Sequence, residues 1–163
     1  MVRKALLCLA LVALFPVAAS AQERAVIGGI GPHVGFGVDP DQLLLGGQAI
    51  IGEIAPNVTF DPGLELGFGD HATVISANFD LHYHFTIEGS SWRPYAGAGM
   101  GIHFVQFDAP PGFEDDSETD VGGDLIVGAG TPTASGNRFF SEIKFGLGDS
   151  YSFRGIVGWN FKM

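Results

Sequence analysis

Hydrophobic and polar residues alternate along most of the chain, and the clearest case lies between His71 and Phe85. Along HATVISANFDLHYHF, every second residue from Ile75 to Phe85 is apolar, while the residues between them are Ser, Asn, Asp and His. Successive side chains of a β-strand point to opposite faces, so this pattern predicts a strand with one apolar and one polar face. After residue 21 no long stretch shows helical periodicity, and glycine interrupts nearly every candidate helix.

Turn-forming residues separate further segments with the same alternation, and together these segments predict eight strands. The expected strands are Gly31–Val38, Leu43–Ile54, Val58–Phe68, His71–Phe85, Trp92–Phe107, Val121–Thr131, Asn137–Leu147 and Tyr151–Phe161. In the second of them, Gln48 alone indicates a polar face. Connections such as Asp39–Asp41 and Gly69–Asp70 are short. Short turns between consecutive strands imply an antiparallel meander.

The two faces of these strands differ in size as well as in polarity. The apolar faces carry Phe, Tyr, Trp, Ile and Leu, whereas the polar faces are rich in glycine, as at Gly97, Gly99 and Gly101. An eight-stranded barrel has an interior only just wide enough for side chains, so the bulky apolar faces are expected outside. This arrangement suits a barrel whose solvent is lipid. The sequence thus predicts an all-β fold, an eight-stranded antiparallel up-and-down transmembrane β-barrel.

Aromatic residues lie near the ends of the predicted strands, where a membrane barrel carries its interfacial girdles. One girdle is expected from Tyr83, Phe85, Trp159 and Phe161. The other is expected from Phe68, Phe107 and Tyr151.

The first residues of the chain have the features of a secretory signal peptide. Two basic residues precede an apolar run from Ala5 to Val17, and the small residues of Ala19–Ala21 form a cleavage site. We therefore expect a signal peptide over 1–21 and a barrel domain over 22–163. Cys8, the one cysteine, falls in the first segment, so the mature chain can form no disulfide or cysteine metal site.

Charge and composition narrow the class of protein further. The net charge of −10, together with the export signal, excludes nucleic acid as a partner. Charged residues make up 16% of the chain, against roughly 25% in ordinary soluble domains. Yet no stretch after residue 21 approaches the ~20 apolar residues of a membrane-spanning helix.

Five segments carry a resemblance to a known family: LGGQAIIGEIAP at 45–56, LELGFGD at 64–70, SWRPYAGAGMGIHF at 91–104, EIKFGLGD at 142–149 and VGWNF at 157–161. The chain resembles the bacterial outer-membrane β-barrel proteins of the small, eight-stranded, OmpA-like kind. The resemblance implies a monomer in the cell outer membrane, in contact with outer-membrane lipids and lipopolysaccharide, and placed there by the outer-membrane insertion machinery. That family usually ends on an aromatic residue, whereas here Lys162 and Met163 follow Phe161. Its members include adhesins, structural anchors, small pores and lipid-modifying enzymes.

In this topology the chain ends and the turns at 55–57, 86–91 and 131–136 are expected on the periplasmic side. Among the external connections, only Asp108–Asp120 is long, and it holds six acidic residues. A calcium site, a bridge through divalent ions to lipid phosphates, and partner binding are all compatible with this acidic loop. A solvated acidic loop is the commoner case.

A catalytic site would need a nucleophile or base with a partner in reach. By the resemblance, lipid-modifying barrels place Ser, His and an acidic residue on the outer rim, and here His71 and Ser150 lie near that rim with Asp70 and Asp149. Asp and Ser are, however, expected in tight turns for backbone reasons. We therefore expect no enzyme and no cofactor.

The spacing Asp80-x-His82-x-His84 could place three metal ligands on one strand face. Pairing Phe85 with Trp92 would put His84 opposite Arg93, His82 opposite Tyr95 and Asp80 opposite Gly97, with a slip of two residues possible. In that register Arg93 disfavours a cation beside His84, and His103 falls opposite Val74. We therefore expect no metal site here.

These residues are instead expected to join a polar network inside the barrel. Its predicted members are Glu65, Asp80, His82, His84, Arg93, His103, Glu142, Lys144 and Arg154. With Asp61, Asp124 and Arg138 they nearly balance in charge, and balanced charges in a narrow lumen pair across it and close it. The expected role is a plugged barrel with a structural or surface-interaction function. The alternatives are a soluble, lipocalin-like periplasmic barrel that binds an apolar ligand, and a small-solute pore or lipid-modifying enzyme.

Overall fold

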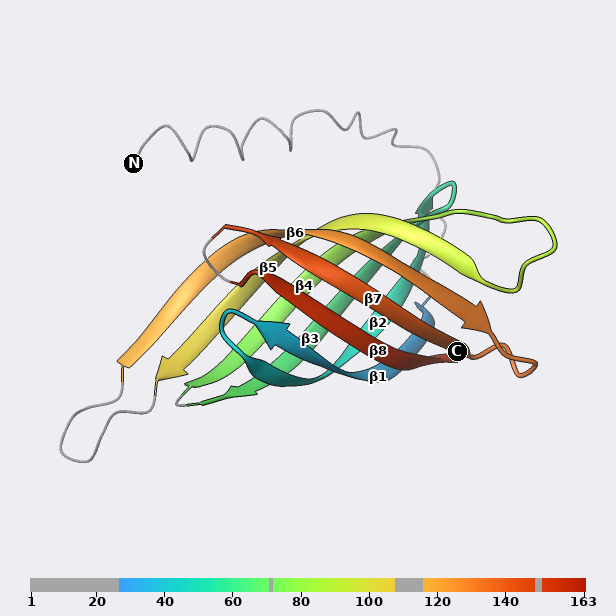
Figure 1. Cartoon of the computed structure of the whole chain (residues 1–163). Coiled ribbons are helices and arrows are strands. Elements are labelled where there is room, and N and C mark those ends of the chain that lie inside the picture. Colours follow the sequence, from blue (N-terminus) through green and yellow to red (C-terminus); the bar gives the residue numbers. More distant parts are fainter. Residues whose placement is uncertain (1–26, 71, 108–115, 149–150) are drawn as a thin grey trace, which may run out of the picture.

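The computed structural model describes residues 27–70, 72–107, 116–148 and 151–163, so the predicted signal peptide, His71, Asp149 and Ser150 lie outside the described residues. The strands are β1 (Ile27–Val38), β2 (Gln42–Ala55), β3 (Val58–Gly69), β4 (Ala72–His84), β5 (Arg93–Phe107), β6 (Asp116–Pro132), β7 (Arg138–Leu147) and β8 (Phe153–Lys162). Each pairs antiparallel with its neighbours in sequence, and β8 pairs with β1 to close the barrel (Figure 1). None of the described residues forms a helix long and apolar enough to cross a membrane.

The faces of the strands are oriented as the alternation predicts. In β3, Leu64 is 66% exposed on the outer surface, while its neighbour Glu65 is 2% exposed inside the barrel. In β4, Ile75 and Phe79 are exposed, whereas Ser76, Asn78 and Asp80 are buried. A soluble barrel would show the reverse order of polarity. The described part of this barrel is therefore apolar outside and largely polar inside.

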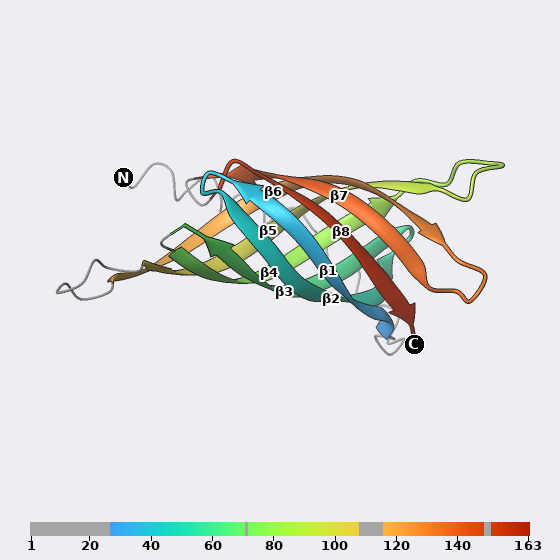
Figure 2. The ribbon, with the colours of Figure 1, turned by 60° about the horizontal axis from the view of Figure 1, so that its bottom comes forward.

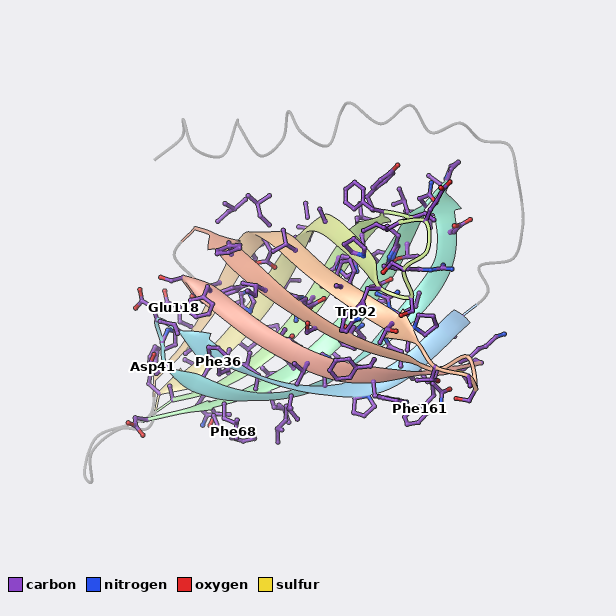
Figure 3. All side chains as sticks on the ribbon, turned by 45° about the vertical axis from the view of Figure 1, so that its right-hand side comes forward. Phe36, Asp41, Phe68, Trp92, Glu118 and Phe161 are labelled. Atoms are coloured by element: carbon purple, nitrogen blue, oxygen red, sulfur yellow. The ribbon has the colours of Figure 1, made fainter. Side chains whose placement is uncertain are left out.

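The strands are inclined to the barrel axis, and their ends form two rims (Figure 2). The C-terminal rim is the one at which β8 ends, and it also carries the turns after β2, β4 and β6. Asn57 stands in the first of these turns with a φ of 63°, a left-handed conformation that Asn tolerates better than most residues. The opposite rim carries the ends of β1, β3, β5 and β7. Phe36 and Phe68 lie at the opposite rim and Phe161 at the C-terminal rim (Figure 3).

Two strands begin several residues before the positions that the hydrophobic pattern predicts. Strand β1 starts at Ile27, and β6 starts at Asp116, within the predicted acidic loop. Residues 116–120 pair with residues 103–107 of β5, whereas the pairing of β6 with β7 begins only at Gly123, so β6 extends past the end of β7. The prediction of a loop over Asp108–Asp120 was therefore wrong for 116–120, because acidic residues there hid the strand pattern. The remainder, 108–115, lies outside the described residues.

The hairpin of β4 and β5 differs from the predicted register by two residues. His84 pairs with Tyr95, His82 with Gly97 and Asp80 with Gly99. The predicted pairings of these residues with Arg93, Tyr95 and Gly97 were wrong, as was the pairing of His103 with Val74, since His103 lies opposite Ser76. An even slip keeps each side chain on its face, so the division into inner and outer residues is unchanged.

Tyr151 was wrongly assigned to an outer aromatic girdle. It precedes β8, and its side chain is only 3% exposed, inside the barrel. The backbone bends at Ser152, whose amide donates to the Val38 carbonyl and whose carbonyl accepts from the Gly146 amide. The other predicted girdle residues are exposed: Tyr83, Phe85, Trp159, Phe161, Phe68 and Phe107. Phe107, however, shares the inner phase of His103 and Val105 on β5 and lines a cavity inside the opposite rim, so its assignment to an outer girdle was also wrong.

The interior also holds apolar side chains that the sequence did not place there. Leu44, Phe140 and Ile156 form a buried cluster between β2, β7 and β8. Leu44 lies within a run of three leucines, and Phe140 follows Phe139, so neither shows alternation with its neighbours. This cluster fills part of the lumen, and the ring of Phe140 meets the ring of His33 edge to face at a centroid distance of 6.5 Å.

Candidate functional site

The middle of the barrel is crossed by a buried ion pair between strands that are not neighbours. Lys144 Nζ on β7 donates to Asp80 Oδ2 on β4 at 2.5 Å, and it lies 3.8 Å from Glu142 Oε1. All three side chains are buried. Because each charge has an opposite partner, the low-dielectric interior can hold them.

A second buried ion pair joins β8 to β3 across the lumen. Arg154 Nη1 donates to Glu65 Oε2 at 2.9 Å, and His33 Nε2 on β1 lies 3.3 Å from the other oxygen, Glu65 Oε1. Arg154 is among the largest fully buried side chains. Together, Lys144 and Arg154 tie four strands to each other through the lumen.

Histidines and a tyrosine extend the network toward the C-terminal rim. His82 Nδ1 lies 2.9 Å from Asp61 Oδ2, and His84 Nε2 lies 3.0 Å from Thr59 Oγ1. Tyr95 donates its hydroxyl proton to Glu142 Oε2 at 2.8 Å. The ring of Tyr95 lies against both histidine rings, at centroid distances of 4.7 Å and 5.4 Å.

A third group of contacts lies toward the opposite rim. Tyr151 donates to Asp124, and its ring carries the Arg154 guanidinium 3.9 Å from the ring centroid. His103 Nδ1 lies 2.8 Å from Ser76 Oγ. Polar side chains therefore occupy much of the described lumen from one rim toward the other, together with a smaller number of buried apolar residues.

Glycines on β5 provide the room that these side chains need. A Cβ atom at Gly97 would come within 2.7 Å of His82 Cδ2, and one at Gly99 would overlap the Asp80 carboxylate. Gly101 faces Asn78 and His103 in the same way. The three glycines thus leave space for the polar residues of β4, as the sequence predicted.

Gly99→Ala is expected to lower the free energy of unfolding by about 1–3 kcal/mol, because the added methyl displaces Asp80 from Lys144. The measurement is denaturant-induced unfolding of the protein folded in detergent. Gly123→Ala is the matched control, since a Cβ there would meet its nearest neighbour, the Gly99 carbonyl oxygen, at 3.7 Å, an ordinary contact. Equal stability of the two variants would contradict the packing described here.

Seven of the nine predicted network residues are buried in the lumen: Glu65, Asp80, His82, His103, Glu142, Lys144 and Arg154. His84 lies near the C-terminal rim and is partly buried, while Arg93 is exposed at that rim and stands outside the network. Sequence reasoning missed His33 and the two tyrosines, Tyr95 and Tyr151, as polar members. His33 could have been found, because it alternates with Gly31, Gly35 and Gly37 along β1.

The described residues contain no group of three or more His, Cys, Asp or Glu side chains placed to hold a metal ion. In the Asp80-x-His82-x-His84 segment, Asp80 bonds to Lys144, His82 to Asp61 and His84 to Thr59. Of the catalytic candidates considered from the sequence, Asp70 is exposed in a turn, while His71, Asp149 and Ser150 lie outside the described residues.

Cavities open at both rims, and they differ in charge. The cavity at the C-terminal rim has a volume of about 290 Å³, and its charged lining residues are Arg93, Arg138 and Glu53, beside His84. At the opposite rim, cavities of about 390 Å³ and 520 Å³ share Asp39, Pro40 and Asp70. The lining is therefore mainly basic at one rim and mainly acidic at the other.

No family model matches this chain, and no curated protein matches it. Solved structures do match over most of the chain. The N-terminal β-barrel domain of Pseudomonas aeruginosa OprF aligns with a TM-score of 0.70 at 15% identity, over 83% of this chain and 96% of that chain. Neisserial surface protein A aligns with a TM-score of 0.58 at 12% identity, over 82% and 91%. The Yersinia pestis outer membrane protein Ail aligns with a TM-score of 0.51 at 10% identity, over 83% and 99%.

These alignments establish the fold, which is that of the small eight-stranded outer-membrane β-barrels. They confirm the fold class predicted from the sequence. At identities of 15% or less they carry no residue-level function to this chain.

Proposed function

We propose that this chain, which has the fold of the small outer-membrane β-barrels, is an integral outer-membrane protein with a plugged lumen and a structural or surface-interaction role. The observation that carries the proposal is the polarity of the barrel. Large apolar side chains cover the outside from rim to rim, as Leu64, Met100 and Leu125 do in its middle. Water would not tolerate such a continuous apolar surface, whereas the hydrocarbon core of a membrane favours it.

Two further observations support this role over the alternatives. A lipocalin-like barrel would need an apolar interior for its ligand, and here buried Asp, Glu, His, Lys and Arg side chains occupy most of the lumen. The predicted near balance of charge was wrong for the described residues, because five carboxylates and only two basic side chains, Lys144 and Arg154, are buried in the lumen. A pore nevertheless needs an open path, whereas here Lys144 and Arg154 pair with carboxylates across the lumen, and Asp61 and Asp124 meet His82 and Tyr151. We propose no enzymatic activity and no cofactor.

We also propose how the barrel is oriented in the membrane and which partners it has. The turns after β2, β4 and β6 would face the periplasm, and the opposite, acidic rim would face the exterior. The partners would be outer-membrane lipids and lipopolysaccharide, together with the machinery that inserts the barrel. The protein would act as a monomer.

The plugged lumen predicts that the purified full chain conducts few ions across a planar lipid bilayer, because paired side chains fill the path between the rims. The measurement is single-channel current in salt solution, and the expected result is a flat baseline with at most brief, rare openings. A steady, reproducible conductance step for each inserted molecule would contradict the plug. An eight-stranded protein of known pore activity, inserted under the same conditions, controls for failed insertion.

A further inference from the structure

The acidic cavity at the opposite rim has features that the plugged barrel does not explain. We propose that it binds a linear polyamine, a flexible chain of methylene groups that carries several ammonium charges. The cavity consists of two adjoining hollows, the first of about 390 Å³ and the second of about 520 Å³. The first hollow is lined by four carboxylates, those of Asp39, Asp70, Glu118 and Asp120. The adjoining hollow adds Asp41. Glu118 and Asp41 both lie at this end of the barrel (Figure 3).

The floor of the first hollow carries a buried acceptor that faces no donor. Gln42 is 7% exposed, and its Oε1 atom has no hydrogen-bond partner among the described residues. His103 also lines the hollow, and its Nε2 atom likewise has no partner in the described part of the chain. If His103 Nδ1 donates to Ser76 Oγ, then Nε2 is an acceptor. Buried acceptors are normally satisfied, so this site suits a ligand that donates N–H groups.

The positive charge at the floor does not offset the carboxylates. Of the residues that line the first hollow, Arg154 is basic, but its Nη1 donates to Glu65 at 2.9 Å and its guanidinium lies over the Tyr151 ring. Its charge is therefore engaged below the cavity. Asp39 accepts one hydrogen bond, from Ser152 Oγ at 3.0 Å, to one of its two carboxylate oxygens. The hollow as a whole favours a cation.

The spacing of the carboxylates selects an extended cation over a metal ion. They come from the β1–β2 turn, the β3–β4 turn and β6, and the described residues show no group of three that could hold one ion. A divalent ion needs several oxygens at about 2.0–2.6 Å from one point. A polyamine instead places its charges several bonds apart, so each ammonium group can meet a different carboxylate.

Apolar walls between the acidic groups match the methylene segments of such a ligand. Ala72, Val74, Val105 and Phe107 line the first hollow, and Pro40 lies in both hollows. A pocket with apolar walls and a few placed polar groups is the usual form of a small-molecule site, and about 300–1,000 Å³ is its usual volume. The first hollow, at about 390 Å³, falls in that range.

Titration calorimetry of the full chain, folded in zwitterionic detergent, tests the proposal with spermidine as the probe. We expect saturable binding with one spermidine per barrel. The double variant Glu118→Gln/Asp120→Asn should weaken it at least tenfold, and Gln42→Leu should weaken it severalfold. The charge-matched control Glu53→Gln/Glu88→Gln, at the C-terminal rim, should stay within twofold of the wild type. A heat-dependent gel shift verifies that each variant is folded.

Competition distinguishes the ligand classes. A monoamine such as propylamine should bind at least thirtyfold more weakly than spermidine, and Mg²⁺ should displace spermidine no better than Na⁺ at equal ionic strength. Absence of saturable binding would overturn the proposal. So would equal weakening by the two double variants, which would show a general effect of net charge, or displacement by Mg²⁺ or Ca²⁺ at concentrations below that of spermidine, which would show a divalent metal site.

Discussion

Lys144→Met is expected to lower the free energy of unfolding by about 3–5 kcal/mol, the usual cost of removing one partner from a buried ion pair. The variant keeps the length of the side chain but leaves Asp80 without its partner, and it leaves Glu142 with only the Tyr95 hydroxyl. The measurement is equilibrium unfolding in urea or guanidinium, with the protein folded into lipid vesicles.

Two controls identify the buried charges as the cause of this loss. Lys162→Met removes the same charge from an exposed position at the end of β8 and should change stability by no more than about 0.5 kcal/mol. Adding Asp80→Asn to Lys144→Met should recover part of the loss, because the uncompensated carboxylate is then absent. A Lys144→Met variant as stable as Lys162→Met would contradict the network described for the lumen.

Leu64→Arg is expected to destabilise the barrel in vesicles by about 2–4 kcal/mol, the cost of a charged side chain on the lipid face near the bilayer midplane. Leu64 lies in the middle of β3 and is 66% exposed on the outer surface. In a water-soluble barrel, an arginine at so exposed a position would be neutral. The same unfolding measurement therefore separates a lipid-facing surface from a water-facing one.

Ile87→Arg is the matched control for depth. Ile87 is 50% exposed but lies in the turn between β4 and β5, beyond the strands. A charge there should cost about 0–1 kcal/mol. Equal effects at Leu64 and Ile87 would argue against a membrane that surrounds the middle of the barrel.

The fold could be predicted from the sequence because the strongest signals came from whole strands. In β3 and β4, alternation is nearly uninterrupted, and the small residues of one face set which side turns inward. The pattern indicated the inward or outward direction of single side chains less clearly. The run Leu43-Leu44-Leu45 in β2 conceals that only the middle residue is buried, at 1% exposure.

The predictions of register, strand start and side-chain direction were wrong where packing, and not the local sequence pattern, determines the structure. The register of β4 with β5 depends on the whole hairpin, and a slip of two residues preserves every face, so alternation could not fix it. The start of β6 is acidic and extends past the end of β7, so no alternation of apolar residues marks it in the sequence. Tyr151 has the alternation phase of an outer residue, yet the chain turns before β8 and carries its ring inward over Arg154's guanidinium.

The sequence predicted most of the residues in the polar network but not which of them contact each other. Its buried residues share the inner phase of their strands, which the sequence shows directly. Which carboxylate meets which base depends on distances across the lumen between strands far apart in the chain, as for Lys144 with Asp80 and Arg154 with Glu65. No local pattern contains those distances.

We expect lipid to surround the apolar outer surface of this barrel. The measurement that tests it most directly is fractionation of a Gram-negative host that produces the full chain, combined with gel electrophoresis of heated and unheated samples. A lipid-facing surface predicts recovery in the detergent-resistant outer-membrane fraction, with a band that shifts on heating. Release of the protein by osmotic shock as a soluble periplasmic species would contradict it.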